Sequence, residues 1–297
     1  MMKIGLGTAQ FGQHYGLSNM QGMTPAGEVR EILAYAWGNG VTLLDTAPAY
    51  GLSEEVLGGA MSAHAAFTIV TKTPTFQNTK IEKEDAARIK DAFRSSLYKL
   101  RQPNLYALLV HHGTDLLKEG GQRLWEAMEN VKAEGIVRKI GASVYSPAEV
   151  DALLNKYPLD IVQLPLNVFD QRMVQNGCLQ YLKNQGVEIH SRSVFLQGLL
   201  LTLPNELPMH FNAIKPLMKQ YYDELKTKGI SPIKATLSFV YRQPNIDGII
   251  IGINNQNHLK EIVASVANTD ELNKIDFSKY ALKDEAIINP SLWNIAP

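Results

Sequence analysis

Short apolar runs alternate with longer amphipathic stretches along the whole chain. Eight short runs, each bounded by turn residues, cover residues 3–8, 41–46, 67–73, 105–111, 139–144, 161–166, 187–194 and 248–253. Between them, apolar residues recur at helical spacing, as in residues 24–40, 82–100, 124–135, 147–157, 173–186 and 233–243. A strand followed by a helix, repeated eight times, predicts parallel strands joined by crossover helices. The simplest closed arrangement is a single-domain α/β fold, the (β/α)8 TIM barrel, over residues 1–297.

The first amphipathic stretch, residues 24–40, carries its own boundary signals. Thr24 is expected to cap the N-terminus of this helix, with Pro25 at the first helical position. Gly38 or Gly40 is expected to end it.

An open, doubly wound sheet is the competing architecture. Such a sheet binds a dinucleotide through a GxGxxG fingerprint that follows its first strand and opens a helix. Residues 5–16, GLGTAQFGQHYG, hold several glycines but not this spacing. The barrel therefore explains the pattern better.

Composition excludes several classes of protein. Hydrophobic residues make up 45% and charged residues 20% of the chain, which is typical of a globular protein with a large core. Lys plus Arg and Asp plus Glu both number 29, so no overall field favours nucleic acid or a membrane surface. The single cysteine, Cys178, has no partner for an internal disulfide, and no apolar run approaches the roughly 20 residues of a membrane helix. We expect a cytoplasmic protein that binds neither nucleic acid nor membrane.

Four polar residues lie at or just past the ends of successive predicted strands: Asp45, Tyr50, Lys72 and His111. In a barrel the catalytic groups come from the C-terminal ends of several strands. Because side chains alternate along a strand, His111 is expected on the inner face and His112 on the outer face. Each residue alone also suits an ordinary structural or surface role, so it is the set that indicates chemistry.

This set suits proton transfer to a carbonyl. A charged Lys72 is expected to lower the pKa of the Tyr50 phenol, and Asp45 to keep Lys72 charged. His111 is expected to hydrogen-bond the carbonyl oxygen and orient it. None of the four is a good covalent nucleophile, and they do not form a metal shell. The set therefore predicts reduction of an aldehyde or ketone, with Tyr50 as the acid and the hydride supplied by a cofactor.

The whole chain resembles the aldo-keto reductase family. The matching motifs are GLGTAQFG at residues 5–12, LDTAPAYG at 44–51, VTKT at 70–73, LLVHH at 108–112, GASVY at 141–145, QLPLN at 163–167, RSVFLQGLL at 192–200 and IIIGINNQNHLKE at 249–261. Their order and spacing carry the resemblance, since each fragment alone is weak. The resemblance implies the Asp, Tyr, Lys and His tetrad at Asp45, Tyr50, Lys72 and His111. It also implies a nicotinamide cofactor, usually NADPH, held across the barrel mouth without a glycine fingerprint.

The resemblance implies cofactor contacts that are only partly matched. Ser143 and Gln163 match residues that hold the nicotinamide carboxamide, but Val144 stands in the place of an Asn. Arg192 stands where many relatives carry a tyrosine that stacks on the ring. The remaining implied contacts are Thr8, Ser193, Gly198, Gly252, Asn254, Asn255, His258 and Glu261. No Lys or Arg matches the contact to the 2′-phosphate, so NADPH is expected from family habit and NADH stays open.

Loops at the same barrel face are expected to set substrate choice. Phe11, His14, Phe76 and Trp293 are predicted to line the substrate pocket, and Tyr15 and Tyr145 are further candidates. Residues 203–216 stand where relatives carry a loop over the cofactor and are a candidate lid. A small polar carbonyl compound such as a sugar is the expected substrate class, while the oligomeric state is not encoded in the sequence.

Two other functions remain open from the sequence. A barrel of this family can act as a regulatory subunit that binds the nicotinamide cofactor and a partner protein with little turnover. A metal-dependent hydrolase using Asp45, His111, His112 and His190 is the other alternative, although these residues lack a convincing ligand spacing. We therefore expect no metal site.

Overall fold

The computed structural model describes all residues except 1–2, 18, 20, 267–274 and 294–297. Eight parallel strands close into a barrel, each bonded to the next and the last to the first. The strands are β1 Ile4–Gly7, β2 Leu43–Asp45, β3 Thr68–Lys72, β4 Leu105–Val110, β5 Val137–Ser143, β6 Ile161–Pro165, β7 Glu188–Arg192 and β8 Gly248–Gly252. The predicted single-domain (β/α)8 fold is confirmed. Seven of the eight predicted runs contain a whole strand, and β5 begins two residues before its run.

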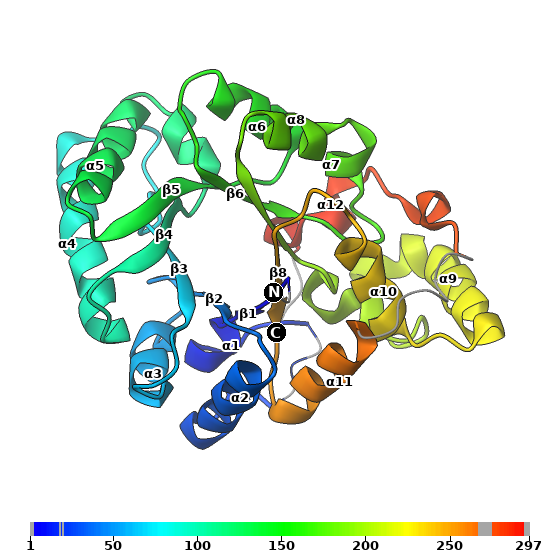
Figure 1. The fold of residues 1–297 in the computed structure, drawn as a ribbon. Coiled ribbons are helices and arrows are strands. Elements are labelled where there is room, and N and C mark those ends of the chain that lie inside the picture. The colour runs from blue at the N-terminus through cyan, green and yellow to red at the C-terminus, as the bar shows by residue number, and fades with distance from the viewer. Residues whose placement is uncertain (1–2, 18, 20, 267–274, 294–297) are drawn as a thin grey trace.

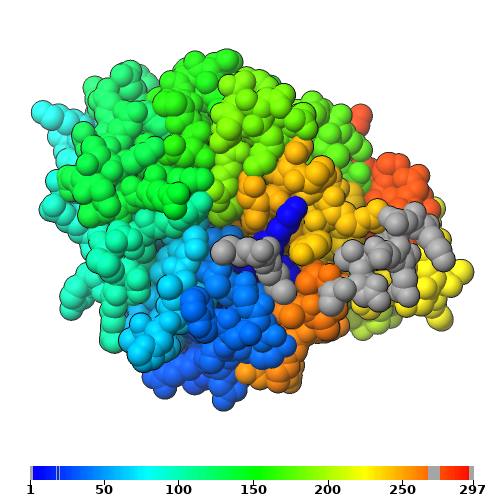
Figure 2. All heavy atoms as spheres, in the orientation of Figure 1, coloured from blue at the N-terminus to red at the C-terminus, as the bar shows by residue number. Residues whose placement is uncertain are grey.

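Helices form an outer ring around these strands (Figure 1). The α-helices are α1 Ala9–Gly12, α2 Ala26–Gly38, α3 Ser53–Ala60, α4 Lys83–Leu100, α5 Gly121–Ala133, α6 Pro147–Leu154, α7 Arg172–Gln175, α8 Cys178–Asn184, α9 Lys215–Lys228, α10 Pro232–Tyr241, α11 Gln256–Val266 and α12 Glu285–Ile288. Short 3-10 helices are η1 Gly113–Leu117, η2 Leu196–Leu201, η3 Met209–Ile214, η5 Phe277–Tyr280 and η6 Pro290–Leu292. In the space-filling view the ring is closed over most of this face, and the first described residues, in dark blue, reach the surface near its centre (Figure 2). Of the helices in the described ranges, none has both the length and the apolar character to cross a membrane.

Two predicted helix boundaries were wrong. Pro25, not Thr24, is the N-cap of α2, because the Thr24 hydroxyl donates instead to the Asn254 carbonyl, 3.2 Å away. The helix expected over residues 173–186 is divided into α7 and α8. Gly177 between them has a left-handed φ of 77°, which interrupts the helical path.

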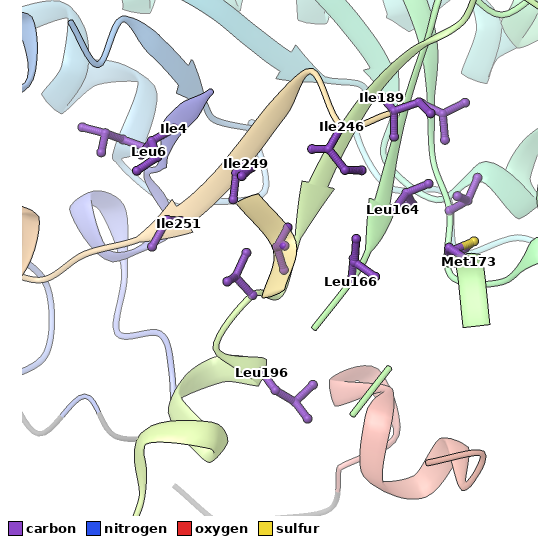
Figure 3. Packing of buried hydrophobic residues seen from close by; sticks show 14 of the residues in the cluster. Ile4, Leu6, Leu164, Leu166, Met173, Ile189, Leu196, Ile246, Ile249 and Ile251 are labelled. Atoms are coloured by element: carbon purple, nitrogen blue, oxygen red, sulfur yellow. The ribbon is translucent and has the colours of Figure 1, made fainter. Parts of the chain in front are cut away.

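The core has two parts, which follow from strand alternation. Ile4 and Leu6 of β1 and Ile249 and Ile251 of β8 belong to the large cluster between barrel and helices (Figure 3). A smaller cluster, Val70, Ala107, Leu109 and Ile161, lies apart from it, with Leu43 packed against it. These residues occupy the alternate positions of their strands, which face the barrel interior. The C-terminal ends of the strands above this inner layer hold the polar side chains.

Candidate active site

A cavity of about 420 Å³ lies at the C-terminal ends of the strands. Its wall takes residues from or just after every strand, as the barrel architecture predicts. The predicted tetrad, Asp45, Tyr50, Lys72 and His111, lies together on this wall. His112 is not part of the wall, although its ring centroid is only 5.0 Å from that of His111.

Lys72 and Asp45 form a buried ion pair. The Lys72 Nζ lies 2.8 Å from both carboxylate oxygens of Asp45 and 3.1 Å from the Thr46 carbonyl. These three acceptors match the three N–H donors of an ammonium group. Burial lowers the pKa of Lys72, and the Asp45 carboxylate opposes that effect.

Close backbone packing places Tyr50. A Cβ at Gly12 would lie 2.0 Å from the Tyr50 carbonyl oxygen, so only glycine lets α1 approach this loop. Gly51 follows with a left-handed φ of 59°, and the Leu52 N–H donates to the Gly12 carbonyl at 3.1 Å. Two backbones in contact therefore fix the position of the tyrosine.

The Tyr50 phenol has a raised pKa. Burial is the main cause, the Asp45 charge adds to it, and Arg192 opposes both. Lys72, whose Nζ lies 4.9 Å from the ring centroid, was expected to bring this pKa below its usual value, but burial and the Asp45 charge prevail. The expected direction was therefore wrong. At neutral pH the phenol keeps its proton, so it is a proton donor.

His111 lies edge-on to Tyr50, with ring centroids 5.8 Å apart and planes at 88°. Burial lowers its pKa to about 3, and the positive charge of Lys72 adds to the effect. The imidazole is therefore neutral near pH 7 and has one N–H to donate. In the described part of the chain, its buried Nδ1 has no hydrogen-bond partner. The ring is thus an available donor or acceptor in the cavity.

Gln163 presents an unused acceptor to the cavity. Its Nε2 donates to the Asp45 Oδ1 at 2.7 Å, while its buried Oε1 has no partner among the described residues. Ser143 is its register neighbour on β5. A buried carbonyl oxygen without a donor is costly, and an amide N–H₂ from a bound molecule would satisfy it. The pair therefore fits a nicotinamide carboxamide.

Arg192 is held at the end of β7 by three contacts. Its Cζ lies 4.2 Å from the Tyr145 ring centroid, Nη2 donates to the Val144 carbonyl at 3.0 Å, and Nη1 donates to the Ser193 Oγ at 3.2 Å. The stack is a cation–π contact. The guanidinium therefore has a fixed position on the cavity wall.

The other predicted cofactor residues divide into two groups. Residues on the cavity wall are Thr8, Ser143, Gln163, Arg192, Ser193, Gly198, Gly252, Asn254, His258 and Glu261. Asn255 is not on the wall, because its side-chain oxygen accepts the His258 backbone N–H at 2.9 Å near the start of α11.

The four residues predicted for the substrate pocket do not line the cavity. Phe11 and Phe76 are buried in the core outside the barrel. His14 is exposed, and its Nε2 lies 2.6 Å from the Asn19 carbonyl. Trp293 packs edge-on against Phe211, with centroids 4.9 Å apart, and donates to the Ile287 carbonyl. Apolar packing and local hydrogen bonds therefore use these side chains elsewhere.

The aromatic wall comes instead from Tyr15, Tyr145 and Phe195. The first two were candidates because they follow strands, but the sequence analysis missed Phe195 and Gln197. The chain around them takes left-handed φ values at Ser193 and over residues 196–198. Hydrophobic periodicity in the sequence does not predict such an irregular backbone. The candidate lid, residues 203–216, contributes nothing to the described wall.

The ligand set of the metal alternative does not assemble. His190 lies 2.7 Å from Glu188, on its own strand, and is absent from the cavity wall. In the ranges that the structure describes, no group of three or more His, Cys, Asp or Glu side chains is placed to hold a metal ion.

Comparisons with known proteins point in one direction. The model of the "Aldo/keto reductase family" matches residues 3–282. Aldo-keto reductase YhdN of Bacillus subtilis (strain 168) is 28% identical over 92% of this chain and 88% of its own. L-galactose dehydrogenase of Arabidopsis thaliana is 26% identical over 84% of this chain and 81% of its own.

Solved structures share the fold. The aldo-keto reductase AKR11C1 from Bacillus halodurans, in its holo form, superposes with a TM-score of 0.72 at 20% identity, covering 96% of this chain and 94% of its own. The putative aldo-keto reductase PA4992 from Pseudomonas aeruginosa gives a TM-score of 0.67 at 23% identity, with 89% of each chain covered. At these identities the likeness is one of architecture.

Proposed function

The chain belongs to the aldo/keto reductase family, and on that premise we propose that its tetrad reduces the carbonyl group of a small polar molecule. Members of the family are NAD(P)H-dependent oxidoreductases, and this protein is one of them. The observation that carries the proposal is one cavity wall that brings a neutral phenol, a buried ion pair and an unused amide acceptor together.

Each tetrad residue has a distinct role in the proposal. The reduced nicotinamide, when bound, supplies the hydride. His111 donates a hydrogen bond to the carbonyl oxygen and orients it, and Tyr50 gives its proton to the same oxygen as charge develops there. Lys72, 4.9 Å from the phenol ring centroid, then stabilises the phenolate, and Asp45 holds Lys72 in place.

Ser143 and Gln163 would hold the carboxamide of the cofactor, and Arg192 would lie beside the ring. Asn254 and His258 would face the adenosine end, and Glu261 the adenine. Family habit favours NADPH over NADH. No Lys or Arg that follows β8 contributes to the described wall, so the 2′-phosphate would rely on Asn254 and His258. Fluorescence titration with each reduced cofactor tests this preference.

The substrate class is proposed as a small polar aldehyde or ketone, such as a sugar. Tyr15 and Gln197, which hydrogen-bond each other at 3.2 Å, give the wall a hydroxyl and an amide group near its aromatic rings. The relative named L-galactose dehydrogenase is consistent with a sugar. Initial rates with a panel of sugars and simple aldehydes at saturating reduced cofactor test this class.

Replacing Tyr50 by Phe tests the proposed proton donor. Tyr50→Phe removes only the hydroxyl, so we expect turnover of a good aldehyde substrate to fall at least about 100-fold, with cofactor affinity changed only a few fold. Tyr98→Phe is the matched control, because Tyr98 is 86% exposed. Near-normal turnover by Tyr50→Phe contradicts the assignment. A wild-type protein that binds reduced cofactor but never oxidises it in a single turnover with any aldehyde would favour the regulatory alternative.

A further inference from the structure

A cluster of buried hydroxyl groups adjoins the residues that carry the Lys72–Asp45 ion pair. Its members are Thr8, Thr46 and Ser53, and each of them is 0% exposed. Ser53 is the first residue of α3. Its Oγ lies 2.8 Å from both the carbonyl oxygen and the Oγ1 of Thr8, and 3.1 Å from the Thr46 Oγ1. Ser53 and Thr46 are absent from the described cavity wall, so neither is placed to touch a molecule bound there.

The chemistry of the groups fixes the direction of these hydrogen bonds. The Thr8 Oγ1 donates its proton to the Asp45 carbonyl at 2.9 Å, so toward Ser53 it can only accept. The Thr8 carbonyl can only accept as well, and therefore the single hydroxyl proton of Ser53 goes to Thr8. In the third contact the Thr46 hydroxyl is then the donor and Ser53 the acceptor. Ser53 thus joins the other two hydroxyl groups.

This cluster holds the main chain on both sides of the Asp45 peptide. The backbone N–H and the Oγ1 of Thr8 both donate to the Asp45 carbonyl, at 3.0 and 2.9 Å. The next carbonyl along the chain, that of Thr46, accepts the Lys72 ammonium at 3.1 Å. The Ser53 hydroxyl therefore connects the residue after β1 with the residue whose carbonyl receives the lysine.

Ser53 is also bonded to the loop that carries the proposed proton donor. Its backbone N–H donates to the Tyr50 carbonyl at 3.1 Å, while its side chain bonds to Thr8 and Thr46. One residue therefore links the tyrosine, through its main chain, to the strand ends around the ion pair, through its side chain. The distance that this link governs is the one between the Lys72 Nζ and the Tyr50 ring centroid, 4.9 Å.

We propose that Ser53 is a positioning residue, which holds the Tyr50 phenol at its working distance from the Lys72–Asp45 pair. This inference rests on the proposed function, because it concerns the step in which Tyr50 gives up its proton. Without the Ser53 hydroxyl, the buried Thr46 hydroxyl loses its acceptor at this position, and a buried polar group without a partner is costly. The strand ends then relax away from their present positions. Displacement of a reacting group by about 1 Å can slow a reaction about 100-fold.

Single-turnover rates test the inference, with the enzyme saturated by the reduced cofactor and by a good aldehyde substrate. We expect Ser53→Ala to lower the rate about tenfold or more, with the dissociation constant of the reduced cofactor changed by less than about twofold. The ratio of the rates in H₂O and D₂O should rise, because proton transfer from a displaced phenol becomes slower.

Thr236→Val is the matched control. It removes a buried hydroxyl that bonds to the Tyr221 hydroxyl at 3.1 Å, and neither residue is on the described cavity wall. We expect this variant to lose stability, as Ser53→Ala does, but to keep the wild-type rate and the wild-type isotope ratio.

A double variant separates positioning of the phenol from a general structural role. Ser53→Ala should slow the wild-type protein but should not slow Tyr50→Phe further, because the hydroxyl that Ser53 positions is then already gone. Two results overturn the inference: a wild-type rate in folded Ser53→Ala, or the same fold loss from Ser53→Ala in the Tyr50→Phe protein as in the wild type.

Thr46→Val decides the matter if Ser53→Ala does not fold by circular dichroism. It removes the other hydroxyl of the same hydrogen bond and keeps the side-chain shape, so we expect a slower single turnover and a raised isotope ratio. A wild-type rate in Thr46→Val would then overturn the inference. The proposed function fails on different results: near-normal turnover by Tyr50→Phe, or a wild-type protein that never oxidises bound reduced cofactor. The two failures are thus distinguishable.

Discussion

The barrel holds two clusters made of the same four kinds of side chain. At the C-terminal ends of the strands these are Asp45, Tyr50, Lys72 and His111. Nearer the N-terminal ends of β4, β5 and β7 they are Glu188, Tyr106, Lys139 and His190. In this second cluster Glu188 receives hydrogen bonds from Tyr106 at 2.6 Å and from Lys139, and lies 2.7 Å from the His190 Nε2.

The two clusters differ in which side chains bond to the carboxylate and which face the cavity. Glu188 uses the phenol, the amine and the imidazole of its cluster, and hydrogen bonds from His190 and Lys139 help lower its pKa to about 2 despite burial. Asp45 takes Lys72 and Gln163 instead, which leaves the phenol and the imidazole facing the cavity. An acid, a phenol, an amine and an imidazole therefore do not by themselves make a reactive site. The groups that face the cavity decide where chemistry is available.

Removing the lysine of each cluster should show the largest difference. Lys72→Met leaves the carboxylate of Asp45, which is 3% exposed, without its counter-ion. We therefore expect the free energy of unfolding to fall by about 3–5 kcal/mol, and carbonyl reduction to be lost. Lys139→Met should cost about 1 kcal/mol or less, because the Lys139 side chain is 26% exposed and Glu188 keeps Tyr106 and His190. Urea denaturation and initial rates measure both. Equal losses in the two variants would remove the distinction between the clusters.

Gln163→Leu sharpens the comparison at the unused acceptor. We expect the affinity for reduced cofactor to fall about tenfold, because the carboxamide loses a buried hydrogen-bond partner. Gln122→Leu, on the exposed surface of α5, is the control. Fluorescence titration measures both variants. Unchanged cofactor affinity in Gln163→Leu would mean that its free oxygen serves another purpose.

A further prediction concerns pH. The pKa of His111 is about 3 in the fold and about 6.5 in the unfolded chain, so the unfolded chain binds more protons between these values. The neutral, buried imidazole therefore costs no stability above pH 6.5. As the pH falls toward 3, proton uptake by the unfolded chain lowers the free energy of unfolding. We expect His111→Gln to show a shallower loss of unfolding free energy between pH 6.5 and 4.5, measured by urea denaturation at each pH. The same slope in both proteins would show that the imidazole does not titrate as described.

The sequence predicted the barrel and the tetrad because both rest on local regularities. Strand alternation and strand-end positions place Asp45, Lys72 and His111 on one inner surface once the sheet closes. Thr24 and Asn255 were misjudged because their polar groups serve contacts that depend on the finished fold: Thr24 bonds to the loop after β8, and Asn255 holds the start of α11.

The substrate wall was the hardest part to predict. Phe11 and Trp293 are aromatic residues like Tyr15, so the sequence alone cannot tell which of them lines the cavity. In the fold, Phe11 on α1 is buried in the core and Trp293 packs against Phe211. Phe195 enters the wall through a run of left-handed residues, which L-amino acids adopt only under tertiary constraint. The raised pKa of Tyr50 could not be predicted from the sequence either, because it depends on burial and on Asp45 lying close by.

The contact between Gly12 and the Tyr50 backbone has a practical consequence for protein engineering. Since Tyr50, the proposed proton donor, is positioned by main-chain contacts, we expect that the loops around it can be changed for new substrates without moving it. Conversely, even one added methyl at position 12 would displace the donor from a distance, while leaving every group that takes part in the reaction chemically intact.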